Sequence, residues 1–210
     1  MSEIGMITPV TLETVQEYAV NDGMMCILTA EDVTAFKACK TAEEAIALVS
    51  GKQDQWLGGT SGTTDINEGR ESWSPEHNGL RLPLMGARFP STAKPSIKTK
   101  LVQFKPKNIA MASGGADIEG ENTKAVWIKP RMAFKLSDYH TLLWFTNHGN
   151  DGIIGTILYN ALCTTGLKWQ VGDKQIGTCD VEFLGHAGSV TENNYLPMEH
   201  FIIKSSGAAA

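Results

Sequence analysis

The chain has 210 residues and a mass of 22.7 kDa, with 42% hydrophobic and 20% charged residues. This composition excludes a disordered or low-complexity chain, and the net charge of −5 argues against a protein devoted to binding a nucleic-acid backbone. The longest apolar run, Ile153–Cys163, is too short to cross a bilayer. The chain starts without the basic residues of a secretion signal, and its four cysteines form no Cys-x-x-Cys pair. We therefore expect a soluble protein with reduced thiols, made in the cytoplasm.

Residues 1–55 are expected to form an N-terminal segment with one short helix. Thr41 followed by Glu44 is a capping-box pair, and Ser50-Gly51 supplies a stop signal. These signals predict a helix over Thr41–Val49. Met1–Tyr18 is only weakly amphipathic, and no element is assigned to it.

A long two-stranded excursion is expected over Gly58–Phe89. This stretch is rich in Gly, Ser, Thr, Asn and Pro and poor in large aliphatic residues, and Asn78-Gly79 is typical of a tight turn. A loop of this length in a compact domain usually has a function of its own or becomes ordered against a partner.

The following part of the chain predicts strands separated by turn residues. Apolar and charged residues alternate along Lys94–Phe104 and Thr178–Leu184, as in strands with one buried face. Ala125–Ile128, Thr141–Phe145 and Ile153–Leu162 are further apolar runs. The last two are apolar on both faces, so both of their faces should be covered.

A second short helix is predicted over Lys105–Ala112, with Pro106 in its first turn and Gly114-Gly115 after its end. The predicted fold is therefore mainly β: a sandwich or barrel with one or two short flanking helices and a long extended loop. The β domain should cover residues 56–204, with the loop at 58–89, and the small-residue tail at 205–210 should be flexible.

Charge is distributed unevenly along the chain. Acidic residues dominate 1–70 and basic residues dominate 71–140. The stretch from 81 to 107 holds no acidic residue but seven basic ones: Arg81, Arg88, Lys94, Lys98, Lys100, Lys105 and Lys107. Three interpretations are equally favoured: a surface for an acidic partner, a solvated strand face, or head-to-tail self-association.

No motif for catalysis, cofactor binding or metal binding is present in the sequence. Thr63 occupies the position where a nucleophile elbow around Ser61 requires glycine, and Gly51-Lys52-Gln53 lacks the P-loop serine or threonine. Cys179 and His186 would be only two ligands, and Cys179 fits better as a small buried residue. We therefore expect no enzyme and no cofactor, and a hydrolase with an unrecognised site is a minor alternative.

The order of several short motifs resembles that of the major tail proteins, or tail tube proteins, of long-tailed bacteriophages. The matching positions are a strand leading into the helix motif Phe104-Lys105-Pro106-Lys107-Asn108-Ile109, then Asn160-Ala161 in a strand, and His186-Ala187 after the last strand of the match. The resemblance covers about Trp56 to Val190. The helix at Thr41–Val49 departs from the short β start of that family.

The resemblance implies a β-sandwich or β-barrel subunit that forms rings, with six copies to a ring, and stacks them into a tube for genome delivery. It implies as partners the subunit itself, the tape-measure, terminator and baseplate proteins, and double-stranded DNA passing through the lumen. Assembly would occur in the host cytoplasm and the protein would reside in the virion tail. Neighbouring subunits would also cover the strands that are apolar on both faces.

Two sets of residues are assigned to this assembly as hypotheses. The subunit or ring contact would use Arg81, Arg88, Lys94, Lys98, Lys100 and Trp73. The lumen lining would use Asp180 and Glu182, because negative charge lets DNA slide. On this interpretation, charge reversal at Lys98 and Lys100 should abolish tube assembly and leave the monomer folded.

The main alternative is a β-sandwich binding module. In a tail-tip or capsid-decoration protein, the loop carrying Trp73 would recognise carbohydrate or a host receptor. A related secretion-system tube is structurally close to the first hypothesis.

Overall fold

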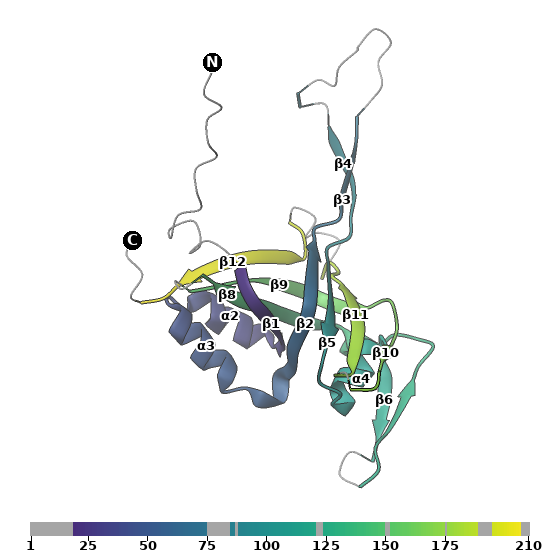
Figure 1. Cartoon of the computed structure of the whole chain (residues 1–210). Helices are drawn as coiled ribbons and strands as arrows, with labels where there is room; N and C mark the ends of the chain where they lie inside the picture. The colour runs from purple at the N-terminus through teal and green to yellow at the C-terminus, as the bar shows by residue number, and fades with distance from the viewer. Residues whose placement is uncertain are drawn as a thin grey trace, which may run out of the picture.

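The computed structural model describes residues 19–74, 85–86, 88–120, 124–149, 152–174, 176–188 and 195–206, and it is mainly β, with a closed six-stranded barrel and three short α-helices (Figure 1). The predicted fold class is confirmed. The strands are β1 Ala19–Leu28, β2 Trp56–Asn67, β3 Arg70–Trp73, β4 Phe89–Ala93, β5 Ser96–Leu101, β6 Ala116–Glu119, β7 Trp127–Pro130, β8 His140–His148, β9 Gly152–Cys163, β10 Lys168–Gln170, β11 Thr178–Leu184 and β12 Met198–Lys204. The helices are α2 Ala30–Ala38, α3 Ala42–Ser50 and α4 Pro106–Ala112, with 3-10 turns η1 Gln53–Gln55 and η2 Leu136–Asp138.

The barrel is built from antiparallel neighbours in the order β11-β5-β2-β1-β8-β9. It closes where β11 meets β9, with Phe183 opposite Cys163 and Leu184 opposite Leu162. β10 extends the sheet from β11, and β12 extends it from β9. Closure removes the sheet edges of the six barrel strands.

Two apolar cores lie on the two sides of the barrel wall. The interior core contains residues of every barrel strand, among them Met25, Leu57, Ile97, Leu142, Leu158 and Phe183. The second core lies outside β1, β8 and β9, where Leu143, Phe145 and Ile157 pack against α2 and α3. The expectation that neighbouring subunits cover the two-faced strands is therefore wrong, because these helices of the same chain cover them.

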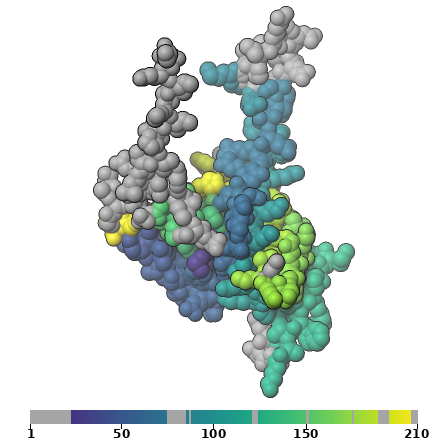
Figure 2. Space-filling view, in the orientation of Figure 1, coloured from purple at the N-terminus to yellow at the C-terminus, as the bar shows by residue number. Residues whose placement is uncertain are grey.

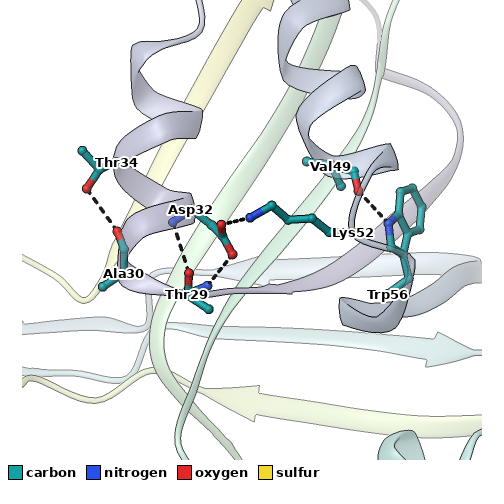
Figure 3. Close-up of polar contacts among 7 residues, drawn as sticks. All are labelled: Thr29, Ala30, Asp32, Thr34, Val49, Lys52 and Trp56. Atoms are coloured by element: carbon teal, nitrogen blue, oxygen red, sulfur yellow. Dashed lines mark hydrogen bonds and ion pairs between the residues drawn. The ribbon is translucent and has the colours of Figure 1, made fainter.

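Short polar contacts hold α2 and α3 in this position (Figure 3). Thr29 Oγ1 accepts from the Asp32 backbone N–H at 3.2 Å, while Asp32 Oδ2 accepts from the Thr29 N–H at 3.1 Å, which closes a capping box. The other carboxylate oxygen of the buried Asp32 pairs with Lys52, which follows α3. Trp56 Nε1 donates to the carbonyl of Val49 at 2.9 Å.

The two predicted helices are confirmed, and α2 was missed. α3 begins after the Thr41 cap, as predicted, and α4 begins at Pro106. The missed helix carries a recognisable start signal, Thr29 followed by Asp32, but its apolar residues are too few to form a clear stripe. A capping pair without an apolar stripe does not predict a helix.

Within the expected N-terminal segment 1–55, Ala19–Leu28 forms β1, which lies between β2 and β8 in the barrel. Its interior residues Met25 and Ile27 alternate with Cys26 and Leu28, which face the helices. Position 23 requires glycine, because a Cβ there would lie 2.3 Å from Trp144 Nε1.

The excursion expected from Gly58 begins later. β2 continues in the barrel to Asn67, which lies opposite Ser96 of β5, and only then does the chain leave the barrel. Thr60 in this stretch is buried, and its Oγ1 donates to the Gly23 carbonyl at 2.9 Å and accepts from Trp144 Nε1 at 3.4 Å.

The predicted strands match observed ones. Lys94–Phe104 contains β5, Thr178–Leu184 is β11, and the two-faced runs lie in β8 and β9. Ala125–Ile128 overlaps β7, which starts two residues later. No helix in the described part of the chain is long and apolar enough to span a membrane.

Candidate assembly surfaces

A two-stranded arm, β3 and β4, projects from the barrel (Figure 2). Its aromatic residues Trp73 and Phe89 lie opposite each other, with ring centroids 5.5 Å apart, and are 54% and 49% exposed. Pro90 lies opposite Ser72. Large exposed aromatic side chains away from a core are typical of interaction sites.

Three expected contact residues belong to this arm or its base. Trp73 lies on β3, Arg88 directly precedes β4, and Lys94 follows it with its backbone N–H bonded to the Gly69 carbonyl at 3.1 Å. Arg81 and the predicted Asn78-Gly79 turn lie outside the described residues.

The outer face of β2, β5 and β11 carries the remaining candidates. Lys98 lies between Asp65 of β2 and Glu182 of β11, and Lys100 lies between Ser61 and Asp180. Opposite residues in neighbouring antiparallel strands point to the same side of the sheet. Lys98, Lys100, Asp180 and Glu182 therefore share one face, which we call the polar face.

The polar face differs from the arm because its charges are internally balanced. Lys100 Nζ lies 3.8 Å from Asp180 Oδ1, and Gln170 Nε2 donates to Asp180 Oδ2 at 3.0 Å. β2 bulges between Ser61 and Asp65, and a hollow of about 860 Å³ lies between this bulge and β10, lined by polar residues and by Trp169, Val171 and Ile176. The basic residues and acids that the sequence assigned to separate surfaces are thus close neighbours.

Asn108, in the helix motif of the resemblance, is a buried clamp. Its Nδ2 donates to the Leu57 carbonyl at 2.6 Å and to the Gln103 carbonyl at 2.8 Å. One side chain on α4 therefore ties the start of β2 to the segment that follows β5. These two contacts give Asn108 a structural role in this chain.

The other two motifs of the resemblance meet in space. Asn160 has a positive φ of 46° and forms a bulge in β9. Its Nδ2 donates to the His186 carbonyl at 3.0 Å, and His186 Nδ1 lies 3.0 Å from the Asn160 carbonyl. Because the Asn160 carbonyl can only accept, Nδ1 of this imidazole carries the hydrogen.

The Asn160 bulge keeps β9 apolar inside the barrel. Leu158 faces the interior core before the bulge and Ala161 faces it after, three positions later instead of two. An extra residue in the left-handed conformation makes this shift possible.

Replacing Asn160 by alanine is expected to destabilise the protein by about 2–3 kcal/mol, because alanine is strained at positive φ and leaves the His186 carbonyl without its donor. Asn160→Gly should cost only about 1 kcal/mol, since glycine accepts the φ and loses the hydrogen bond alone. Urea unfolding followed by tryptophan fluorescence measures both. Equal losses in the two variants would contradict a role for the backbone conformation.

Three of the four cysteines, Cys26, Cys163 and Cys179, are buried. All four are free, and Cys163 and Cys179 lie in the interior core, as expected for Cys179. Burial raises the pKa of the Cys26 thiol to about 12 and also raises the pKa of the Cys179 thiol. Among the residues that the structure describes, no group of three or more His, Cys, Asp or Glu side chains could hold a metal ion.

Comparison with known proteins found no relative: no protein-family model and no curated protein matches this chain. The interpretation of these surfaces therefore depends on their geometry and chemistry.

Proposed function

We propose that this protein is a structural subunit that assembles into rings, most simply of six copies, and that the rings stack into the tail tube of a long-tailed bacteriophage. The resemblance in motif order suggests this function, and the contacts of Asn108, Asn160 and His186 give those motifs a physical role in the fold. The protein would then reside in the virion tail.

The arm is the observation that carries the proposal. It extends beyond the barrel and presents Trp73 and Phe89 with about half of each side chain exposed. Since an isolated two-stranded hairpin is marginally stable in water, contact with another subunit would both order the arm and bury its aromatic pair. An arm of this kind suits the joining of one ring to the next.

The polar face is the best candidate for the lumen lining. Its outward-pointing residues on β2, β5 and the first part of β11 are Ser61, Thr63, Asp65, Lys98, Lys100, Asp180 and Glu182. Acids beside each lysine limit attraction to phosphate, and none of these seven residues has a large apolar side chain. Trp169, Val171 and Ile176 line the hollow beside them. Double-stranded DNA would slide along such a wall.

A tube of this kind also needs partners at its ends and along its bore. Under this proposal they are the tape-measure protein, the tail terminator and the baseplate or tip proteins. Lys98 and Lys100 would belong to the bore together with Asp180 and Glu182, while Arg88, Lys94 and Trp73 would remain in the ring contact.

Electron microscopy of the purified protein at rising concentration tests the proposal directly. We expect rings and then tubes of uniform bore. A protein that stays monomeric up to millimolar concentration, in sedimentation as well as in micrographs, would overturn it.

Charge reversal at Lys98 is expected to weaken the barrel itself, because the new carboxylate would lie between Asp65 and Glu182. Like charges directly opposite are destabilising, so Lys98→Glu should cost about 1 kcal/mol and Lys98→Gln less than about 0.5 kcal/mol. The double variant Lys98→Glu/Glu182→Lys should recover most of the loss. Urea unfolding at low salt measures these differences, and a double variant no better than Lys98→Glu would show that the pairs do not interact.

A carbohydrate- or receptor-binding module is the second candidate, favoured by the same exposed Trp73–Phe89 pair. Aromatic faces are suited to stack on sugar rings. A glycan array probed with the monomer distinguishes it: a signal lost in Trp73→Ala, from a protein that forms no rings, would favour this candidate.

A further inference from the structure

A second exposed apolar surface lies on another side of the barrel from the arm. Five large apolar side chains are exposed within eleven residues of chain, and Met132 and Leu136 are 102% and 92% exposed. We call this surface the 126–136 patch; it consists of Val126, Trp127, Met132, Phe134 and Leu136. Patches of this kind usually mark a contact with another molecule.

Hydrogen bonds and an ion pair hold the 131–136 part of the patch in place. The Arg131 backbone N–H donates to the Gly115 carbonyl at 3.1 Å, and its guanidinium pairs with Asp138 at 2.5 Å. The Lys135 backbone N–H donates to Asp138 Oδ2 at 2.7 Å. A preformed surface loses little entropy when it binds.

Among the described residues around the patch, basic residues outnumber acidic ones. Asp117, Glu119 and Asp138 are each within ion-pair distance of Arg131, Lys129 or Lys135. The exposed lysines Lys105, Lys107 and Lys124 add further positive charge around α4 and β7. The patch therefore suits an acidic partner surface.

An acidic surface lies on α2 and α3 of the same chain. The exposed side of α2 and α3 carries Glu31, Glu43 and Glu44, while the buried Asp32 is already paired with Lys52. Two exposed lysines lie in the same part of the chain: Lys37, which pairs with Glu199, and Lys40. Ile46 is 41% exposed there, among the small residues Ala35, Ala38 and Ala47. Figures 1 and 2 show α2 and α3 at one flank of the barrel and β6 and β7 at the other.

We propose that the outer surface of α2 and α3 in one copy docks on the 126–136 patch of the next copy, and that this lateral contact closes the ring. The inference rests on the proposed self-assembly and names its lateral interface. A contact between two different surfaces is heterologous, and it generates a ring when the rotation closes. The acidic helices and the basic rim attract each other, and the exposed apolar residues of both surfaces become buried.

Other occupants of the patch fit less well. A patch-to-patch contact would place the basic rims of two copies against each other. The arm also carries more basic than acidic residues in its described part, with Arg70, Arg88 and Lys94 against Glu68 and Glu71. The α2 and α3 surface is the one whose charge complements the rim.

The test uses two variants that each block one surface. The patch variant is Met132→Glu/Leu136→Glu and the helix variant is Ile46→Lys/Ala47→Lys; all four side chains are exposed. Both are made in a Trp73→Ala/Phe89→Ala background, which suppresses stacking between rings, and their folding is checked by thermal unfolding. Ile202→Glu, an exposed change on β12, serves as the control.

In sedimentation velocity, the background protein and the Ile202→Glu control are expected to form rings. Each blocked variant alone should form rings only at about 100-fold higher protein concentration. An equimolar mixture should form heterodimers and nothing larger, because one intact helix surface meets one intact patch. This contact should weaken as NaCl rises from 0.05 to 0.5 M.

Several outcomes would overturn the inference. Normal rings from both blocked variants would leave the proposed function standing and remove this interface. Dimers of the helix variant alone would mean that the patch binds the patch of a second copy. Binding of the protein to anionic vesicles that only the patch variant loses, with rings intact, would mean that the patch binds a membrane. Wild-type protein that never assembles would instead reject the proposed function.

Discussion

Replacing Asn108 by aspartate is expected to destabilise the protein by about 3–5 kcal/mol. The Asn108 Nδ2 donates to two backbone carbonyls, those of Leu57 and Gln103, and the side chain is only 3% exposed. Aspartate has nearly the same shape but offers no amide donor, so a buried carboxylate would face two carbonyl oxygens. Urea unfolding followed by tryptophan fluorescence measures the loss.

The same substitution at Asn67 is the matched control. Asn67 is exposed, and its Oδ1 accepts from the Gly69 backbone N–H at 2.8 Å. A carboxylate accepts this hydrogen bond equally well, so Asn67→Asp should change stability by less than about 0.5 kcal/mol. Similar losses in both variants would show that Asn108 does not act as a clamp between β2 and the segment after β5.

The double variant Trp73→Ala/Phe89→Ala is expected to lose tubes while keeping single rings. Each aromatic residue buried at a protein interface is worth about 2 kcal/mol or more, so removing both should raise the concentration needed for stacking by about 1,000-fold. Negative-stain electron microscopy distinguishes rings from tubes, and sedimentation gives their onset concentrations.

The monomer should remain folded in this variant, because both side chains project from the arm and neither belongs to a buried core. Tyr195→Ala, at a side chain 89% exposed outside the arm, is the control and should form tubes normally. Tubes of ordinary length from the arm variant would reject the arm as the ring-to-ring contact.

The sequence predicted the elements whose patterns are local. β5 and β11 were recognisable because lysines and acids alternate with buried residues along them, and α3 and α4 because a capping pair and an early proline mark their starts. β1 and α2 were missed. In β1, Asp22-Gly23 interrupts the apolar run, and the Gly23 that looks like a turn residue is needed to admit the Trp144 ring.

The arrangement of the candidate surfaces depended on contacts between distant segments. That Lys98 lies beside both Asp65 and Glu182 follows from the pairing of β5 with β2 and β11, and no local pattern encodes which residues lie opposite one another. The sequence likewise predicted that both faces of β8 and β9 are covered. It did not predict that α2 and α3 cover the outer face, which the packing of Val33, Phe36 and Val49 shows.

The proline in the arm affects whether a further strand can pair with it. Pro90 of β4 offers no backbone N–H, and charged Arg70 and Glu71 lie on the partner strand. An added strand would find a gap in the ladder on one side and repelling or solvated charges on the other. The projecting ribbon can therefore offer its aromatic side chains to a neighbour without seeding open-ended cross-β growth at high subunit concentration.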